Sequence, residues 1–333
     1  MTANTNVVIF YNQVTQDSPK DELDVLAQVE VVSRALKDLG YHPIELGFSI
    51  SLSDAINTLK ECNPLLVFNL TESLLGDGRL IHFAGSLLDH LGIPYTGCST
   101  EAMFLTSNKM LTKKLLDLAG IATPQWITIN NSRSPRELPS GNYIIKSAWE
   151  HASNWFNEDS VIALESGSGR SAETKAREIL NARMRQTGKE FFAERYIDGR
   201  EFNLSVLAGE VLAVPEIKFV DYAEDKLKVV DFKAKWEENS FEFHHTPRCF
   251  DFPESDHELL ENLRRISRQC WDLFELRGYA RVDFRVDSEG QPWVLEINAN
   301  PCISADSGFY AAAEKSGLPF TRVVERIIKD TLG

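Results

Sequence analysis

The chain has 333 residues, of which 43% are hydrophobic and 25% are charged. These fractions are typical of folded globular proteins and exclude a disordered or fibrous chain. The net charge is −14, from 35 basic and 49 acidic residues. No run of Lys or Arg forms the basic surface of a nucleic-acid-binding protein, so we predict no nucleic-acid partner.

The chain shows no sign of a membrane or secreted protein. No segment approaches the roughly 20 consecutive apolar residues that span a bilayer, and the first residues lack a secretory signal. The five cysteines are scattered and form no C-x-x-C pair, which argues against a disulfide framework or a cysteine zinc site. Cys249 follows His244 and His245 closely, but an ordinary strand and turn is favoured there over a metal site. We predict a soluble, cytoplasmic protein with no membrane partner.

The first third of the chain alternates short apolar runs with amphipathic ones. Residues 6–10 predict a strand, and residues 21–39 repeat apolar side chains at helical spacing before Gly40. The same reasoning predicts further strands at 43–46, 64–70 and 93–96, with helices at 53–61 and 79–91. Strands that alternate with helices in this way form an open parallel sheet, so residues 1–105 are predicted to be an α/β domain.

The rest of the chain predicts two further units of mixed composition, which makes the whole an α/β (α+β) protein. A helix at 108–120, strands at 126–129, 142–145 and 160–164, and a helix at 172–186 form a central subdomain, residues 106–190. The carboxy-terminal subdomain, residues 191–333, follows. Its expected elements are strands at 191–196, 202–207, 211–214, 280–286 and 293–297, a long helix at 256–276 and two closing helices.

The most specific chemical signal lies in the two strands near the carboxy terminus. Alternation along a strand places Arg281, Asp283 and Arg285 on one face, and Glu296 and Asn298 share a face of the next strand. Two carboxylates and an amide oxygen form a set of hard oxygen ligands that suits Mg²⁺. Arg281 beside them would neutralise charge on a phosphoryl group or a tetrahedral intermediate. The alternative is a solvated hairpin face with unrelated charges.

A second motif, residues 191–203, indicates a purine-nucleotide site. An apolar strand leads to Glu194, a short connector through Ile197, a glycine turn and then Glu201. Such a connector offers backbone groups to an adenine edge, and Glu201 would accept from ribose hydroxyls. An ordinary turn with exposed acids is at least as good an explanation of this motif alone.

Three lysines precede or separate these two motifs along the chain. Lys146 ends an apolar strand, Lys109 opens a helix, and Lys235 follows Asp231 in a short polar segment. A single lysine is usually a solvated surface residue, so only their order around the two motifs gives them weight.

The order of these motifs resembles that of ATP-grasp ligases of the D-alanine–D-alanine ligase kind, over nearly the whole chain. The resemblance implies an ATP-grasp fold, with residues 1–105 as the domain that precedes it. It also implies a reaction in which ATP phosphorylates a carboxylate and an amine of a second substrate attacks the acyl phosphate. The implied cofactors are ATP and two Mg²⁺ ions, with Mn²⁺ as a substitute, and the implied assembly is a homodimer.

The resemblance also assigns roles to individual residues. Lys109 and Lys146 would contact ATP phosphates and the purine side, Glu194 and the Ile197 backbone would bind adenine, and Glu201 would bind ribose. Lys235 would reach the γ-phosphate. Asp283, Glu296 and Asn298 would hold the metal ions, Arg281 would stabilise the intermediate, and Ser307 would help to bind the carboxylate of the nucleophile.

The departures from the family pattern fall on the amino-acid site. Residues 11–17 replace a Gly-rich segment whose Glu binds the ammonium of the first substrate, Trp236 replaces a tyrosine, and Cys302 replaces a glycine. We therefore expect a first substrate other than plain D-alanine. Glu72 and His151 are the candidate replacement polar groups. Trp149, Trp155 and Trp236 line a pocket for a larger carboxylate or, equally, belong to local packing.

Three functions remain open at this point. The first is a ligase that joins a small-molecule carboxylate to an amino acid. The second is a true D-alanine–D-alanine ligase of cell-wall synthesis with an unfamiliar first-substrate site. The third is an ATP-binding protein without turnover, which the joint presence of Arg281, Asp283, Glu296 and Asn298 argues against.

Overall fold

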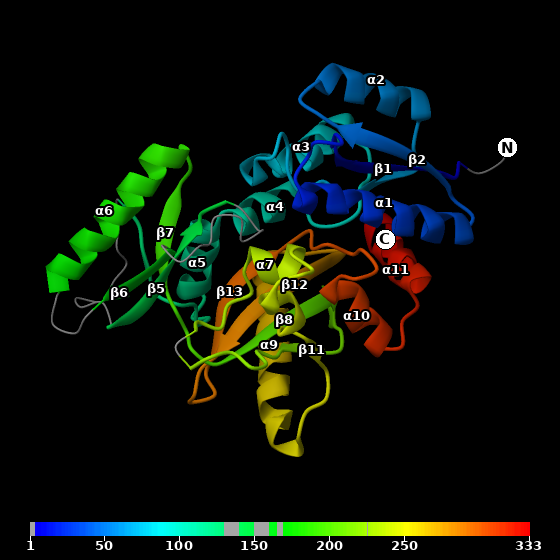
Figure 1. Cartoon of the computed structure of the whole chain (residues 1–333). Coiled ribbons are helices and arrows are strands. Elements are labelled where there is room, and N and C mark those ends of the chain that lie inside the picture. The colour runs from blue at the N-terminus through cyan, green and yellow to red at the C-terminus, as the bar shows by residue number, and fades with distance from the viewer. Residues whose placement is uncertain (1–3, 130–139, 150–159, 165–168, 225) are drawn as a thin grey trace.

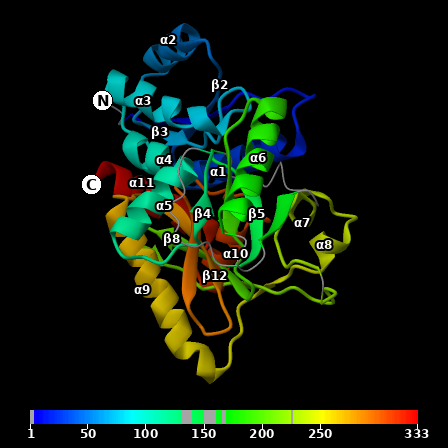
Figure 2. The same cartoon turned by 90° about the vertical axis from the view of Figure 1, so that its left-hand side faces the viewer.

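The computed structural model describes residues 4–129, 140–149, 160–164, 169–224 and 226–333. Within these residues the strands form three sheets, and Figure 1 shows each with its own helices. Figure 2 shows α2 (Leu52–Cys62) at one end of the molecule and α9 (His257–Leu273) at the opposite end. Among the helices of the described residues, none has the length and apolar character needed to cross a membrane.

The amino-terminal domain is a parallel sheet of β1 (Asn6–Asn12), β2 (His42–Phe48) and β3 (Leu66–Asn69), in the order β2-β1-β3. Residues 7–10 of β1 are fully buried because helices cover both faces. Helices α1 (Lys20–Asp38) and α11 (Phe320–Leu332) pack on one face, and α2 and α3 (His82–Leu91) on the other. The strand predicted at 93–96 contributes only a bridge between Val67 and Tyr95.

The central subdomain is an antiparallel sheet in the order β4-β7-β5-β6. Its strands are β4 (Trp126–Ile127), β5 (Gly141–Ser147), β6 (Val161–Leu164) and β7 (Phe191–Arg195), and α6 (Gly169–Thr187) packs against them through Ala176 and Leu180. Because β7 pairs with β4 and β5, the break in the fold comes after β7 and not at residue 190. Likewise residue 105 lies inside a helix, α4 (Thr100–Ser107), which precedes α5 (Lys109–Leu118).

The third sheet carries the chemistry. It runs β11-β10-β8-β12-β13, with β9 (Glu210–Val211) paired to β8, and all its pairs are antiparallel. Its strands are β8 (Arg200–Leu207), β10 (Glu216–Ile217), β11 (Arg248–Cys249), β12 (Tyr279–Val286) and β13 (Pro292–Asn298). Val282 and Phe284 of β12 pack on α9 in the core, so the alternate residues of β12 lie on the opposite face.

Several short elements complete this unit. The 3₁₀ turns η1 (Gly78–Leu80) and η3 (Glu254–Asp256) precede α3 and α9. Between β10 and β11, residues 218–247 form what we call the α7–α8 segment, which contains α7 (Phe232–Trp236) and α8 (Phe241–His244). The loop after β13 leads to α10 (Gly308–Lys315).

The amino-terminal and carboxy-terminal units meet at a close backbone contact. A Cβ atom on Gly278 would lie 2.9 Å from the Cα of Gly97, so only glycine fits there. The Gly278 N–H donates to Asp330 at 2.5 Å, and Arg277 Nε donates to the Gly97 carbonyl at 3.0 Å. We call this contact the glycine junction. It fixes the sheet of the first domain against the third sheet.

Candidate active site

The predicted metal ligands share the open face of β12 and β13. Asp283 lies directly opposite Glu296, and Arg281 lies opposite Asn298, so the four side chains form one patch. Asp283 is only 5% exposed. Two carboxylates that face each other across a ladder repel, and this patch therefore requires cations.

Two protein cations meet that requirement. Arg281 donates to both oxygens of Asp283, at 2.7 and 2.8 Å, and Lys109 Nζ lies 3.3 Å from a Glu296 oxygen. Burial alone would lower the pKa of Arg281, but the Asp283 carboxylate raises it, so the guanidinium stays charged.

The chemistry of this patch fits a divalent cation. Two carboxylates and the Asn298 amide oxygen, which already accepts from the Asn300 N–H at 3.0 Å, form a hard oxygen set. No cluster of three or more His, Cys, Asp or Glu side chains within the described residues could hold a metal. The patch has two such residues and an amide. The metal site considered at His244, His245 and Cys249 is not formed among the described residues. The His245 ring stacks on Phe241 instead, with 3.8 Å between the ring centroids.

Lys235 lies close to the same patch, on α7. Burial and the neighbouring Arg281 lower the pKa of Lys235, while Glu296, Asp283 and Glu201 oppose this shift. The predicted γ-phosphate lysine thus interacts electrostatically with the predicted metal ligands and the ribose carboxylate. The next residue, Trp236, has a buried Nε1 without a hydrogen-bond partner among the described residues.

A buried ion triad supports the nucleotide side. Lys146 Nζ contacts Glu194 at 2.6 Å, and Lys113 contacts the other oxygen of the same carboxylate. Lys113 is fully buried and also donates to the Thr123 hydroxyl at 2.7 Å. Burial raises the pKa of Glu194, but the two lysines lower it by more, so the carboxylate stays charged. Sequence reasoning missed Lys113, although its position four residues after Lys109 places both lysines on one side of α5.

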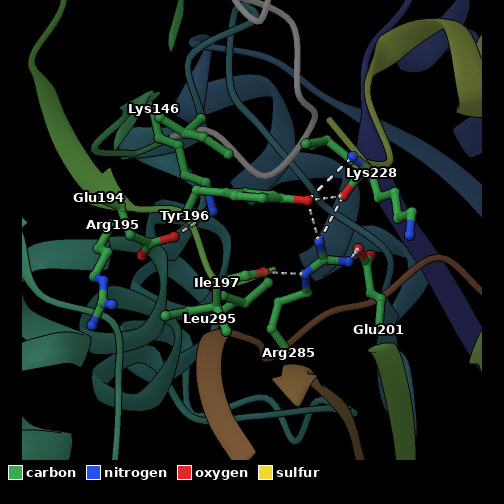
Figure 3. A pocket seen from close by; sticks show the side chains of 11 residues that line it. Lys146, Glu194, Arg195, Tyr196, Ile197, Glu201, Lys228, Arg285 and Leu295 are labelled. Atoms are coloured by element: carbon green, nitrogen blue, oxygen red, sulfur yellow. Dashed lines mark hydrogen bonds and ion pairs between the residues drawn. The ribbon is translucent and has the colours of Figure 1, made fainter. Parts of the chain in front are cut away.

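A pocket opens between the central and carboxy-terminal sheets, next to this triad (Figure 3). It encloses about 300 Å³ of space, part of which is open to solvent. Lys146, Glu194, Ile197 and Glu201, all predicted at the nucleotide, line it. Arg285 also lines it. Strand alternation had placed this residue on the same face as Arg281 and Asp283, but had given it no role.

Glu72 is held in place from the amino-terminal domain. Its carboxylate accepts from Gln28 Nε2 at 2.6 Å, and Gln28 Oε1 accepts from the Ile303 N–H at 3.2 Å. Burial raises the pKa of Glu72 to about 7, and the nearby Arg281 lowers it. Glu72 is therefore near enough to Arg281 for the charge of the guanidinium to affect its pKa.

The substituted residue Cys302 lies beside Glu72. Its thiol contacts Asp24 Oδ2 at 2.9 Å and Ser304 Oγ at 3.0 Å. The backbone of Cys302 does not occupy the left-handed region, so the replacement of glycine there causes no backbone strain. All five cysteines are free thiols.

The remaining predicted residues divide into three groups. Ser307 caps α10 by accepting from the Tyr310 N–H at 3.1 Å, which leaves its hydroxyl hydrogen for a ligand. Trp149 Nε1 donates to Glu190 at 2.9 Å, and Arg79 Cζ lies 5.0 Å from the centroid of the Trp149 ring. Trp149 therefore belongs to a contact between the central subdomain and the amino-terminal domain. His151 and Trp155 lie outside the described residues.

The chain is similar in sequence to D-alanine–D-alanine ligases. Residues 167–329 match the family model described as "D-ala D-ala ligase C-terminus". The chain is 30% identical over 267 residues to a D-alanine–D-alanine ligase of a Synechococcus strain, which covers 78% of this chain and 74% of that enzyme. It is 28% identical over 303 residues to the D-alanine–D-alanine ligase of Carboxydothermus hydrogenoformans, with 90% of each chain covered.

The fold comparison points the same way. The crystal structure of the Bacillus anthracis D-alanine–D-alanine ligase complexed with ATP has a TM-score of 0.73 at 20% identity, with 98% of this chain and 97% of that chain covered. The chain therefore belongs to the D-alanine–D-alanine ligase family of ATP-dependent, C–N bond-forming ligases with the ATP-grasp fold.

Proposed function

We propose that the protein joins the carboxylate of a substrate other than plain D-alanine to the amine of an amino acid, through an acyl phosphate. The observation that carries the ligase chemistry is the grouping of Arg281, Asp283 and Glu296 on one face, in electrostatic contact with Lys235. The choice of a first substrate other than plain D-alanine rests on the replacements at residues 11–17, Trp236 and Cys302. Such a site has cations where a phosphoryl group transfers and carboxylates where a divalent cation binds.

The proposed roles follow the path of the phosphoryl group. Glu194 and the Ile197 backbone hold adenine, Glu201 accepts from ribose, and Lys109 and Lys146 hold the phosphates. Lys235 neutralises charge on the γ-phosphoryl group as the substrate carboxylate oxygen attacks phosphorus and the bond to ADP breaks. Asp283, Glu296 and Asn298 would hold divalent cations, which would supply further charge neutralisation on the phosphates.

The second step forms the amide. The amine of the amino acid attacks the acyl carbon, phosphate leaves, and the amine loses a proton. Arg281 stabilises the negative oxygen of the tetrahedral intermediate, because its guanidinium is fixed in the patch before reaction. Ser307, with its free hydroxyl hydrogen at the start of α10, binds the carboxylate of this nucleophile.

Glu72 is proposed to bind an ammonium group of the first substrate. Gln28 fixes its carboxylate, and Arg281 lies near enough to interact with it, so a substrate can reach both. The carboxylates of Asp24 and Asp21 raise the pKa of Glu72, which shows that the surroundings are negative. Trp236 and His151 are the other proposed contacts of this substrate.

A panel assay tests the function. ADP and phosphate release is measured with Mg²⁺, ATP and single D- and L-amino acids, and then with pairs of an amino acid and a larger carboxylate. Release that requires an amino acid and a second, non-alanine carboxylate supports the proposal. Turnover with D-alanine alone would instead establish the second candidate, which the names of the relatives favour. ATP binding with no turnover across the panel would favour a protein that only binds the nucleotide.

The Glu72 assignment predicts a pH effect on substrate binding. Because burial raises the pKa of Glu72 to about 7, the carboxylate is present above that pH and protonated below it. The KM for the first substrate should therefore fall as pH rises through about 7, whereas Glu72→Gln should raise KM and remove this pH dependence. Glu61→Gln, an exposed acid on α2, is the control. An unchanged KM profile in Glu72→Gln would remove Glu72 from the site.

The metal assignment predicts a Mg²⁺ requirement. Chelation should abolish turnover and added Mg²⁺ should restore it, and we propose two ions per site with Mn²⁺ as a substitute. Asp283→Asn should need more Mg²⁺ for half-maximal activity, since the amide lacks the negative charge that attracts the ion. Asp272→Asn, exposed on α9, is the matched control. Equal Mg²⁺ titrations for both variants would contradict the assignment.

The assembly and location are also proposals. A homodimer follows from the resemblance alone, and sedimentation at enzyme concentrations used in assays tests it. A cytoplasmic location is proposed because the reaction consumes ATP and the thiols are free.

A further inference from the structure

Arg285 is a buried arginine that the proposed reaction does not use. It lies on β12, two residues beyond Asp283, and its cross-strand partner on β8 is Glu201. Only 3% of Arg285 is exposed. A charge this deeply buried is costly unless its donors are satisfied, so what it contacts is informative.

The guanidinium donates to four acceptors from three segments. Arg285 Nε donates to the Ile197 carbonyl at 2.9 Å, and Nη1 donates to Glu201 at 3.3 Å. Its Nη2 donates to the Tyr196 hydroxyl at 3.0 Å and to the Lys228 carbonyl at 2.7 Å. Figure 3 shows these contacts along one side of the pocket.

Two aromatic rings fix the plane of the guanidinium. Arg285 Cζ lies 5.3 Å from the centroid of the Tyr196 ring and 5.5 Å from that of Phe219. Arginine stacks on rings in this way while it directs a rigid fork of donors at its edges, which lysine cannot do. If the position needed only bulk, an apolar side chain would fill it at lower cost.

The acceptors belong to two parts of the enzyme. Ile197 and Glu201 are the proposed adenine and ribose contacts. Lys228 lies in the α7–α8 segment, seven residues before Lys235, the proposed γ-phosphate lysine. Arg285 therefore joins the nucleoside half of the pocket to the segment that carries the phosphate-side lysine.

The α7–α8 segment is itself internally packed. The Tyr222 ring lies 5.2 Å from Phe219 and 5.4 Å from Phe241, and Lys226 Nζ lies 4.6 Å from the Phe241 ring while it pairs with Glu242. A segment with its own small core transmits a constraint at Lys228 better than an irregular loop does.

We propose that Arg285 is a positioning residue that shapes the nucleoside part of the pocket and couples it to the placement of the α7–α8 segment. This rests on the proposed function, because it takes Ile197 and Glu201 as nucleoside contacts. Loss of Arg285 should weaken the binding of every adenine nucleotide to a similar extent. It should also leave the α7–α8 segment open to proteolysis even when ATP is bound.

Calorimetric titration of the full-length protein with ATP and with AMP tests the first part. Arg285→Met should weaken the binding of ATP and of AMP by a similar factor, about ten- to a hundredfold. The reason is that Ile197 and Glu201, the proposed nucleoside contacts, each lose the hydrogen bond that holds them in place. Arg285→Lys keeps the positive charge but lacks the forked set of donors, so its affinity for both nucleotides should lie between that of Arg285→Met and that of the wild type. Lys235→Met should weaken ATP and spare AMP, because that lysine acts on the phosphate side.

Limited trypsin digestion tests the second part. The α7–α8 segment offers trypsin Lys218, Lys226, Lys228, Lys233 and Lys235. ATP with Mg²⁺ should protect these sites in the wild type, and saturating ATP should fail to protect them in Arg285→Met. Arg326→Met is the control, since Arg326 likewise donates to a backbone carbonyl and a carboxylate, those of Leu207 and Glu210, but lies away from the pocket.

The outcomes separate this inference from the ligase function. Wild-type affinity for both nucleotides in a folded Arg285→Met, or a loss for ATP alone, would overturn the nucleoside role. Full protection by ATP would overturn the coupling. If Arg285→Met does not fold, Arg285→Lys decides on the same criteria. These readouts need no turnover, so they hold even if no ligase substrate is found.

Discussion

Replacing Arg281 with methionine should lower kcat by about 10²–10³-fold while ATP still binds. The guanidinium is fixed by two hydrogen bonds to Asp283, and it therefore offers its remaining donors to a developing negative oxygen without reorganising. ATP makes its proposed contacts elsewhere, along Lys146, Ile197 and Glu201. Steady-state ADP release gives kcat, and calorimetry gives the affinity for ATP.

The same variant should also reveal the link between Arg281 and the metal. Without the guanidinium, Asp283 is a buried carboxylate opposite Glu296, so thermal stability should fall in the absence of Mg²⁺ and recover when Mg²⁺ is added. Arg265→Met is the control, because Arg265 lies exposed on α9 with polar partners only. A kcat near that of the wild type would show that Arg281 is not catalytic.

Lys113→Met should lower the free energy of unfolding by about 3 kcal/mol, at the lower end of the cost of breaking a buried ion pair. Glu194 is only 2% exposed and would lose one of its two cationic partners, while Lys146 remains. Urea unfolding followed by circular dichroism measures the change. Lys114→Met, exposed on the same helix, is the matched control.

The sign of the pH effect follows from the lowered pKa of Glu194. A carboxylate whose folded pKa lies below its ordinary value of 4.5 adds stability above that value and loses it as pH falls through the folded pKa. Removal of Lys113 raises the folded pKa, so acid unfolding of Lys113→Met should begin at a higher pH. An acid transition identical to that of the wild type would contradict the ion triad.

The alternation of apolar and polar residues was enough to predict the main sheets and the open face of β12 and β13. Arg281, Asp283, Glu296 and Asn298 follow the period of two along their strands, and that period alone brings them together. The helices α4, α7 and α8 were missed because they are short, at eight, five and four residues, and lack a clear apolar stripe. Their positions depend on contacts with other elements.

The residues missed in the site have partners that are far away in the sequence. Arg285 and Ile197 are 88 positions apart, and Gln28 and Glu72 are 44 apart. No local pattern marks such pairs, since a lone arginine or glutamine in a strand or helix is usually a surface residue. Lys113 is the exception, because its spacing from Lys109 on α5 was visible in the sequence.

The glycine junction has a consequence for how substrates enter. Gly97 and Gly278 touch backbone to backbone, and Arg277 and Asp330 lock this contact with hydrogen bonds. We expect the first and third units to stay together during turnover, because separating them would break this contact and both hydrogen bonds. Any opening of the nucleotide pocket is then expected to come from movement of the central sheet.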